Sequence, residues 1–154
     1  MSIRGITFVD QTVKTKDDGR LYQAIFDDGI LYGCAFSSSG FTLTMGAGHI
    51  IACGRQIKNS AAQNFPLSGA SDGYARVLLV IDLSKTATET SFDQVYTLIQ
   101  YSDSISGFPE VTAEDINAAG RIYQLPLAVC SLSSAGITDI TKRLGKADFK
   151  EAKV

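Results

Sequence analysis

The stretch GASDG (residues 69–73) has the Gly-x-Ser-x-Gly spacing that presents a nucleophilic serine in α/β-hydrolases. That motif requires a strand before the serine and a helix after it, because the sharp turn between them exposes the hydroxyl. Here a loop rich in small and polar residues precedes the stretch, and a strand-like segment follows. The only histidine, His49, comes before Ser71, which is the wrong order for that fold. These residues argue against serine hydrolase chemistry.

Metal coordination needs three or four converging ligands, and the candidate ligands are dispersed. His49 stands alone, and we interpret it as a residue at the start of a strand next to a turn. The cysteines Cys34, Cys53 and Cys130 each lie in an apolar stretch and form no CxxC motif. We interpret them as buried thiols of a protein made in a reducing compartment, with a Cys34–Cys53 disulfide as the alternative if their strands are neighbours.

Four pairs of carboxylates are candidates for catalysis or for calcium binding. The pairs are Asp17 with Asp18, Asp27 with Asp28, Glu89 with Asp93, and Glu110 with Asp115. The first two fit helix-cap and turn positions, because a dedicated calcium loop would alternate its oxygen ligands. The last two would suit glycoside cleavage only at the right separation, and we favour solvated surface positions. We therefore predict no catalytic, cofactor-binding or metal-ligating residues and no cofactor.

Composition narrows the class of protein further. The chain has 154 residues, 45% of them hydrophobic and 19% charged, with a net charge of −2. Its basic residues are scattered, so we expect no nucleic-acid partner. The longest wholly apolar run, residues 77–81, is too short to span a bilayer, and the N-terminus lacks the apolar core of a signal peptide. We expect no membrane insertion. We also expect that the protein is synthesised in the cytoplasm without a signal peptide.

Only two segments have helical character. Residues 16–26 carry apolar side chains at helical spacing and end at a DDG turn. Residues 112–118 begin with TAED, which resembles a capping box, and Gly120 follows as a stop signal. We predict two short helices.

The rest of the chain has strand character. Residues 30–36, 41–45 and 49–59 predict a three-stranded meander with turns at 37–40 and 46–48. Inside the third strand, Gly54 predicts a bulge that redirects Arg55 toward solvent or a carboxylate.

A long surface connection is expected over residues 59–75, with at most a short strand around 65–67. Residues 75–84 are apolar enough for a central strand, paired antiparallel with 94–102. Residues 121–132 form another strand, in which Pro126 suggests an edge or a bulge, and 137–140 add a last strand or turn. The prediction is a mainly β fold, an antiparallel β-sandwich or barrel-like meander with one or two short helices. Residues 1–144 form a single domain, and 145–154 a charged flexible tail.

Three long stretches resemble a family of structural proteins associated with the tails of phages and prophages of Gram-positive hosts, around the baseplate and tail fibre. They are DDGRLYQAIFDDGILYGCAFSSSGFTLTMGAGHIIACGRQI, YARVLLVIDLSKT and INAAGRIYQLPLAVCSLSSAGITDI. The resemblance lies in their order over residues 15–144. The matching positions are Gly46, Gly48, Gly54, Arg55, Ala75, Arg76, Asp82, Ile137 and Ile140.

This resemblance implies a β-rich, non-enzymatic subunit of the virion tail that forms a homo-oligomer, with a trimer as one form, and contacts other tail or baseplate proteins. Many relatives continue into a long fibre, whereas this sequence stops at Val154, so we expect a connector or small baseplate subunit. The alternative is a carbohydrate-binding receptor-recognition module of a tail fibre, which would bind a cell-surface glycan through Tyr74, Tyr96 or Tyr101.

Overall fold

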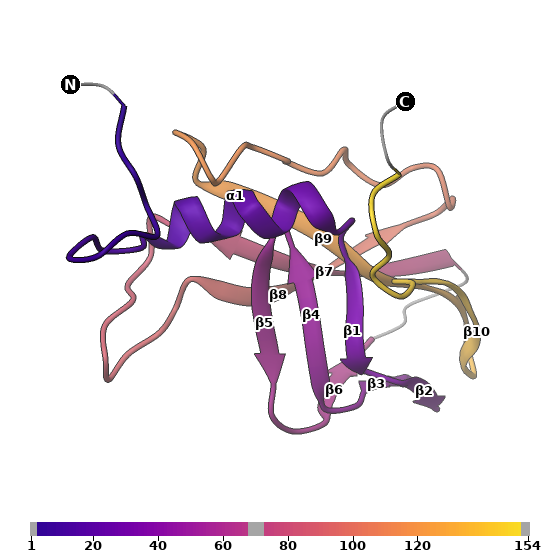
Figure 1. Cartoon of the computed structure of the whole chain (residues 1–154). Coiled ribbons are helices and arrows are strands. Elements are labelled where there is room, and N and C mark those ends of the chain that lie inside the picture. The colour runs from indigo at the N-terminus through magenta and orange to yellow at the C-terminus, as the bar shows by residue number, and fades with distance from the viewer. Residues whose placement is uncertain (1–2, 68–72, 152–154) are drawn as a thin grey trace.

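The computed structural model describes residues 3–67 and 73–151, which form one helix and ten strands in three antiparallel sheets (Figure 1). The elements are α1 (Thr15–Ile25), β1 (Gly29–Gly33), β2 (Phe36–Ser39), β3 (Thr42–Met45), β4 (Gly48–Ala52), β5 (Arg55–Asn59), β6 (Gln63–Pro66), β7 (Gly73–Asp82), β8 (Val95–Ser102), β9 (Ile122–Ser133) and β10 (Gly136–Arg143). The sheet orders are β10-β9-β7-β8, β1-β4-β5 and β2-β3-β6. The mainly β prediction is confirmed. Ser71 of the GASDG stretch lies outside the described residues.

The first half of the chain is a meander of three bent strands. β1 continues into β2, β3 into β4 and β5 into β6, and each pair of elements is separated by two or three residues where the strand bends. A three-stranded meander is therefore present, but the predicted pairing of 41–45 with 49–59 across a turn at 46–48 is wrong. The chain only bends there, so that β3 pairs with β2 and β6, and β4 pairs with β1 and β5. A Cβ on Gly48 would lie 2.1 Å from the Tyr32 carbonyl oxygen, so the bent strands approach too closely for any side chain.

The four-stranded sheet follows the predicted pairing. β7 is central, and it pairs along its length with β8 and β9. Of the two alternatives for Pro126, the bulge holds, since β9 lies between β7 and β10 and the register with β7 shifts between Pro126 and Ala128. β10 is longer than the predicted 137–140.

The prediction of a helix over 112–118 is wrong. Residues 116–119 form a turn, and the amides of Ala118 and Gly120 both donate to the Asp115 carbonyl oxygen. Glu114, one of the two acids of TAED, accepts hydrogen bonds from the amides of Arg121 and Ile122 instead of capping a helix. Pairing across to the start of β9 satisfies the same backbone groups that a helix would have used.

The two halves pack face to face as a sandwich. The four-stranded sheet contributes residues such as Val77, Leu79 and Leu127 to the core, and the bent meander contributes residues such as Leu43 and Ile50. These side chains are at most 5% exposed. Alternation along β3 and β7 puts apolar residues on the inner faces, so the hydrophobic effect holds the layers together.

One side of the sandwich is closed by the chain that follows β10. The Ile30 amide donates to Gly145 and the Ala147 amide donates to Ile30, so this segment pairs with the outer edge of β1. Phe149 stacks on Phe26 with ring centroids 5.0 Å apart. Residues 145–150 thus have fixed partners, in contrast to the loose tail expected over 145–154, of which 152–154 lie outside the described residues. The opposite side, between β5 and β8, has no such strap within the described residues (Figure 1).

Helix α1 packs across the end of the meander on the turn between β4 and β5. Ala52 pairs with Arg55, so Cys53 and Gly54 are the two loop residues, and both have positive φ, 51° and 72°. This is the geometry of a tight type I′ hairpin turn, not of the predicted bulge. A Cβ on Gly54 would lie 1.9 Å from the Gly19 carbonyl oxygen in α1 and 2.4 Å from the Gln23 nitrogen. Gly54 thus both reverses the chain and lets the helix approach.

Replacement of Gly54 tests this contact. Gly40 has a comparable positive φ of 57° but no atom within 4 Å of its Cβ position, so Gly40→Ala isolates the cost of the backbone conformation. We expect Gly40→Ala to lower the free energy of unfolding by about 1 kcal/mol. Gly54→Ala should cost at least about 2 kcal/mol more, because α1 must move away. Urea unfolding followed by circular dichroism measures both, and equal costs would contradict the contact.

Candidate functional site

The turn between β4 and β5 is surrounded by a buried network of polar groups. Asn117, which is only 8% exposed, donates from Nδ2 to the Cys53 carbonyl oxygen at 2.8 Å and to Gln23 Oε1 at 3.0 Å. Its Oδ1 accepts from Arg55 Nε at 3.2 Å, and Arg55 also donates to the Ile116 carbonyl oxygen at 3.0 Å. Arg55 therefore points at an amide and a carbonyl, not at solvent or a carboxylate as predicted.

Asp28 holds the other side of the same turn. One oxygen of its carboxylate accepts from the Cys53 amide at 2.9 Å, and the other accepts from the hydroxyl of Tyr123 in β9. Burial, together with the Asp28 carboxylate, raises the pKa of the Tyr123 hydroxyl. Burial and the same carboxylate raise the pKa of the Cys53 thiol to about 11. Both groups are thus kept in their neutral forms at neutral pH, which does not favour a nucleophilic role for Cys53.

A polar hollow of about 490 Å³ lies beside this network and includes Asp28, Glu114, Asp115 and Tyr123 in its lining. Asp115 forms an ion pair with Arg20 at 2.8 Å, which lowers the pKa of its carboxyl. The two backbone amides that bind Glu114 lower the pKa of that carboxyl too. A general acid needs a raised pKa, so these carboxylates serve as ionised acceptors that join segments of chain.

A larger groove of about 1010 Å³ occupies the open side of the sandwich. One wall is the stripe of α1 that contains Asp18 and Tyr22, and residues of β5 such as Ile57 form another part of the lining. The segment before and at the start of β8, with Phe92 and Val95, lines the groove as well. Tyr22 is 42% exposed and Phe92 is 61% exposed, so apolar surface faces solvent here.

Of the residues singled out from the sequence, Asp27, Asp28, Cys53 and Asp115 come together in the lining of the polar hollow, and the others lie apart. His49 is the second residue of β4, and its ring bonds to Gln56 on β5. The remaining carboxylate candidates, Glu89, Asp93, Glu110 and Asp115, are all exposed, in agreement with surface positions. Within residues 3–67 and 73–151, no group of three or more His, Cys, Asp or Glu residues is arranged to hold a metal ion.

The acidic residues near α1 differ in role from one another. Asp17 and Asp18 lie in the first turn of α1, but the N-cap residue is Lys14 and it makes no side-chain capping bond. Asp28, expected to be a turn residue, instead binds the β4–β5 turn and Tyr123. Sequence reasoning missed this network because its members are up to 95 residues apart and have no characteristic spacing.

Comparison with protein-family models and with curated proteins found no match for this chain. In the part of the chain that the structure describes, no helix is long and apolar enough to cross a membrane.

The buried network predicts a large effect for Asn117→Ala. The substitution removes the donor to the Cys53 carbonyl oxygen and leaves Arg55 Nε without its acceptor, so we expect a loss of about 2–3 kcal/mol in the free energy of unfolding. Asn64→Ala is the matched control, because Asn64 is exposed and, within the described residues, its side chain accepts one hydrogen bond, from Thr44. It should cost less than about 1 kcal/mol. Similar losses in both variants would contradict a structural role for the network.

The thiols provide an independent test. The described structure contains Cys34, Cys53 and Cys130 as free, buried cysteines. Burial is the main cause that raises the pKa of Cys34, and it raises those of Cys53 and Cys130 to about 11. Because only thiolates react fast, we expect no stoichiometric labelling by iodoacetamide at pH 8 in the native protein, and labelling of all three in guanidinium. Rapid native labelling of Cys53 would contradict the assignment.

Proposed function

We propose that this chain is a non-enzymatic structural subunit of a phage or prophage tail, located at the baseplate or beside the tail fibre. Copies of it form a homo-oligomer that connects or supports host-attachment elements. The proposal takes its cellular setting from the ordered resemblance over residues 15–144. The observation that carries the assembly role is the open side of the sandwich, where a free strand edge borders an exposed apolar groove.

Exposed apolar surface supports an assembly role, because large contiguous apolar patches on a lone soluble domain are unusual. Leu31 in the groove is 40% exposed, and elsewhere on the surface Leu21 on α1 is 56% exposed. Tyr32 on β1 is 74% exposed. Burial against another subunit would remove this surface from water, which is the main favourable term in permanent association.

The polar hollow supports the non-enzymatic part of the proposal. Its carboxylates accept hydrogen bonds from backbone amides, an arginine or a tyrosine of the same chain. Each bond joins segments that are distant in sequence or closes a turn, so a structural purpose accounts for these groups. The carboxyl pKa values of Glu114 and Asp115 are lowered, which does not favour either residue as a general acid.

The glycan-binding alternative gains no support from the placement of the tyrosines. Tyr96 and Tyr101 lie five residues apart on β8, so their side chains are on opposite faces of the sheet. Tyr74 pairs with Ser102, at the far end of β8 from Tyr96. A sugar-binding platform needs adjacent aromatic rings, and these three do not provide one.

We expect the full chain to sediment as a defined oligomer at micromolar concentration, because its apolar groove and free strand edge are covered in the assembly. Sedimentation velocity over a dilution series measures this directly. A species that stays monomeric at every concentration would contradict the assembly role.

The location of the chain in the virion provides a second test of the proposed function. Antibodies against the purified chain should label the tail tip of virions induced from the host strain, and antibodies against a capsid protein of the same particles serve as the control. Labelling of the capsid alone, or of no part of the particle, would contradict the tail assignment even if the chain forms an oligomer.

A further inference from the structure

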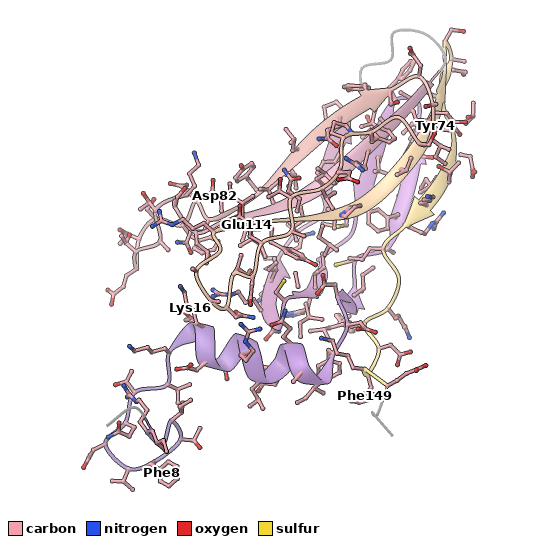
Figure 2. All side chains as sticks on the ribbon, turned by 90° about the horizontal axis from the view of Figure 1, so that it is seen from above. Phe8, Lys16, Tyr74, Asp82, Glu114 and Phe149 are labelled. Atoms are coloured by element: carbon pink, nitrogen blue, oxygen red, sulfur yellow. The ribbon has the colours of Figure 1, made fainter. Side chains whose placement is uncertain are left out.

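An N-terminal arm precedes α1 and has few contacts with the body of the molecule. We define the arm as residues 3–13. Its apolar side chains are exposed: Ile3 by 82%, Ile6 by 37%, Phe8 by 69%, Val9 by 88% and Val13 by 47%. The hydrogen bonds found for the arm are local, such as Gln11 to Phe8 and Arg4 to Gln11. Figure 2 shows Phe8 at the far end of the arm, away from the sheets.

The sequence of the arm favours a strand that this single chain does not form. Ile6, Thr7, Phe8 and Val9 are β-branched or aromatic, the types enriched in strands. They nevertheless adopt no strand and pair with no other strand in the described part of the chain. Natural sequences are usually consistent between local preference and final structure, so this conflict indicates that the segment has a partner strand elsewhere.

The edge of β5 offers unpaired backbone groups to such a strand. β5 pairs with β4 on one side only, and Ala52 and Arg55 flank the two-residue turn as a bonded pair. Because bonded and non-bonded pairs alternate in an antiparallel ladder, the N–H and C=O groups of Gln56 and Lys58 point outward. Neither has another backbone partner among the described residues. Four residues of an arm, about 13 Å when extended, match this edge.

The groove beside β5 suits the arm in polarity and charge. Ile57, Leu83 and Val95 offer apolar surface to one face of an added strand. The charged groups of the groove include Asp18 and Lys58, whereas the charged groups of the arm are Arg4 and Asp10. Arg55 also lines the groove but donates to Asn117 and the Ile116 carbonyl, so Asp18 and Lys58 are the groove charges that can pair with Arg4 and Asp10 of the arm. A strand here would also close the side of the sandwich that the 145–150 segment leaves open.

We propose that the arm of a second copy of this chain adds to β5 as an extra antiparallel strand and buries Phe8 or Val9 in the groove. This inference rests on the proposed function, whose oligomer it explains. The arm emerges at the groove, which Thr15 helps to line, but it runs outward from there (Figure 1). To reach its own β5 edge, the chain would have to reverse at the start of α1. Exchange with another copy needs no such reversal.

The area is sufficient for a stable assembly. An unfolded chain exposes about 1.45 Å² per dalton, so an arm of about 1.2 kDa exposes about 1,700 Å². If two exchanged arms each bury half of that area against an equal area of the partner, the total is about 3,400 Å². This exceeds the about 2,000 Å² at which permanent interfaces begin. Reciprocal exchange closes a dimer, and exchange in one direction around a ring closes a trimer.

The first test changes the arm in the full chain. Phe8→Ser with Val9→Ser removes its two central apolar side chains, and Thr7→Ser with Gln11→Ser is the matched control. All four positions are exposed in the single chain, so neither pair of substitutions should affect folding. We expect the apolar pair to raise the dissociation constant of the oligomer at least 100-fold in sedimentation velocity, and the control pair to leave it within threefold.

The second test changes the receiving edge. Lys58→Pro removes the outward N–H, whereas Lys58→Ala keeps it. Proline is tolerated on an outer strand edge, and circular dichroism checks that the variant folds. We expect folded Lys58→Pro to dissociate. Lys58→Ala loses one exposed charge pair and should keep the dissociation constant within about fivefold of that of the unmodified chain.

The outcomes separate this inference from the proposed function. An oligomer that withstands both the Phe8/Val9 change and a folded Lys58→Pro would overturn arm exchange and leave the assembly role intact. A full chain that is monomeric at every concentration would overturn both arm exchange and the assembly role. This outcome includes a monomer in which the arm occupies its own groove.

Discussion

The close approach of α1 to the turn between β4 and β5 is the constraint on which the rest of the structure depends. Gly54 lies against Gly19, and at the same place the turn donates to Asp28 and accepts from Asn117. Tyr123 binds Asp28 from β9, so the helix, the β1-β4-β5 sheet, the four-stranded sheet and the 114–117 loop meet around two loop residues. Polar groups that are removed from water cost free energy unless they are paired, so the loss of one partner here should destabilise the others. These contacts fix the position of α1 and, with it, the wall of the groove that α1 forms.

The groove exists because a segment of the chain covers one side of the sandwich, whereas no described segment covers the other side. On one side, the segment after β10 bonds to β1 and its Phe149 stacks on Phe26. On the other side, β5 and β8 are edge strands with no strand between them in the described part of the chain. Natural proteins usually protect long edges with charges, bulges or a covering segment. The arm carries the apolar, strand-favouring residues that such a covering segment needs. The proposed addition of an arm to β5 therefore accounts both for the open side and for the exposed arm.

Much of the strand order was predictable from the sequence, because alternation and apolar runs report which residues face a core. The meander, the central position of β7 and its pairing with β8 follow from such patterns. The failures have local causes. The residues 112–118 resemble a capped helix, but Glu114 finds better partners in the amides at the start of β9. Gly54 predicts a bulge inside one strand, whereas the chain turns there; cysteine rarely takes a positive φ, and contacts with Asp28, Asn117 and α1 stabilise the turn. The network around Asn117 could not be predicted, since nothing in the spacing links residues so far apart.

Hydrogen exchange at the β5 edge tests the central claim most directly, namely that another strand covers the open side of the sandwich in the assembly. The account predicts that the outward amides of Gln56 and Lys58 exchange slowly at concentrations where the chain is assembled and rapidly after dilution to the monomer. The amide of Arg55, which faces β4, should be protected at both concentrations and serves as the internal reference. Rapid exchange of Gln56 and Lys58 in the intact oligomer would contradict the account.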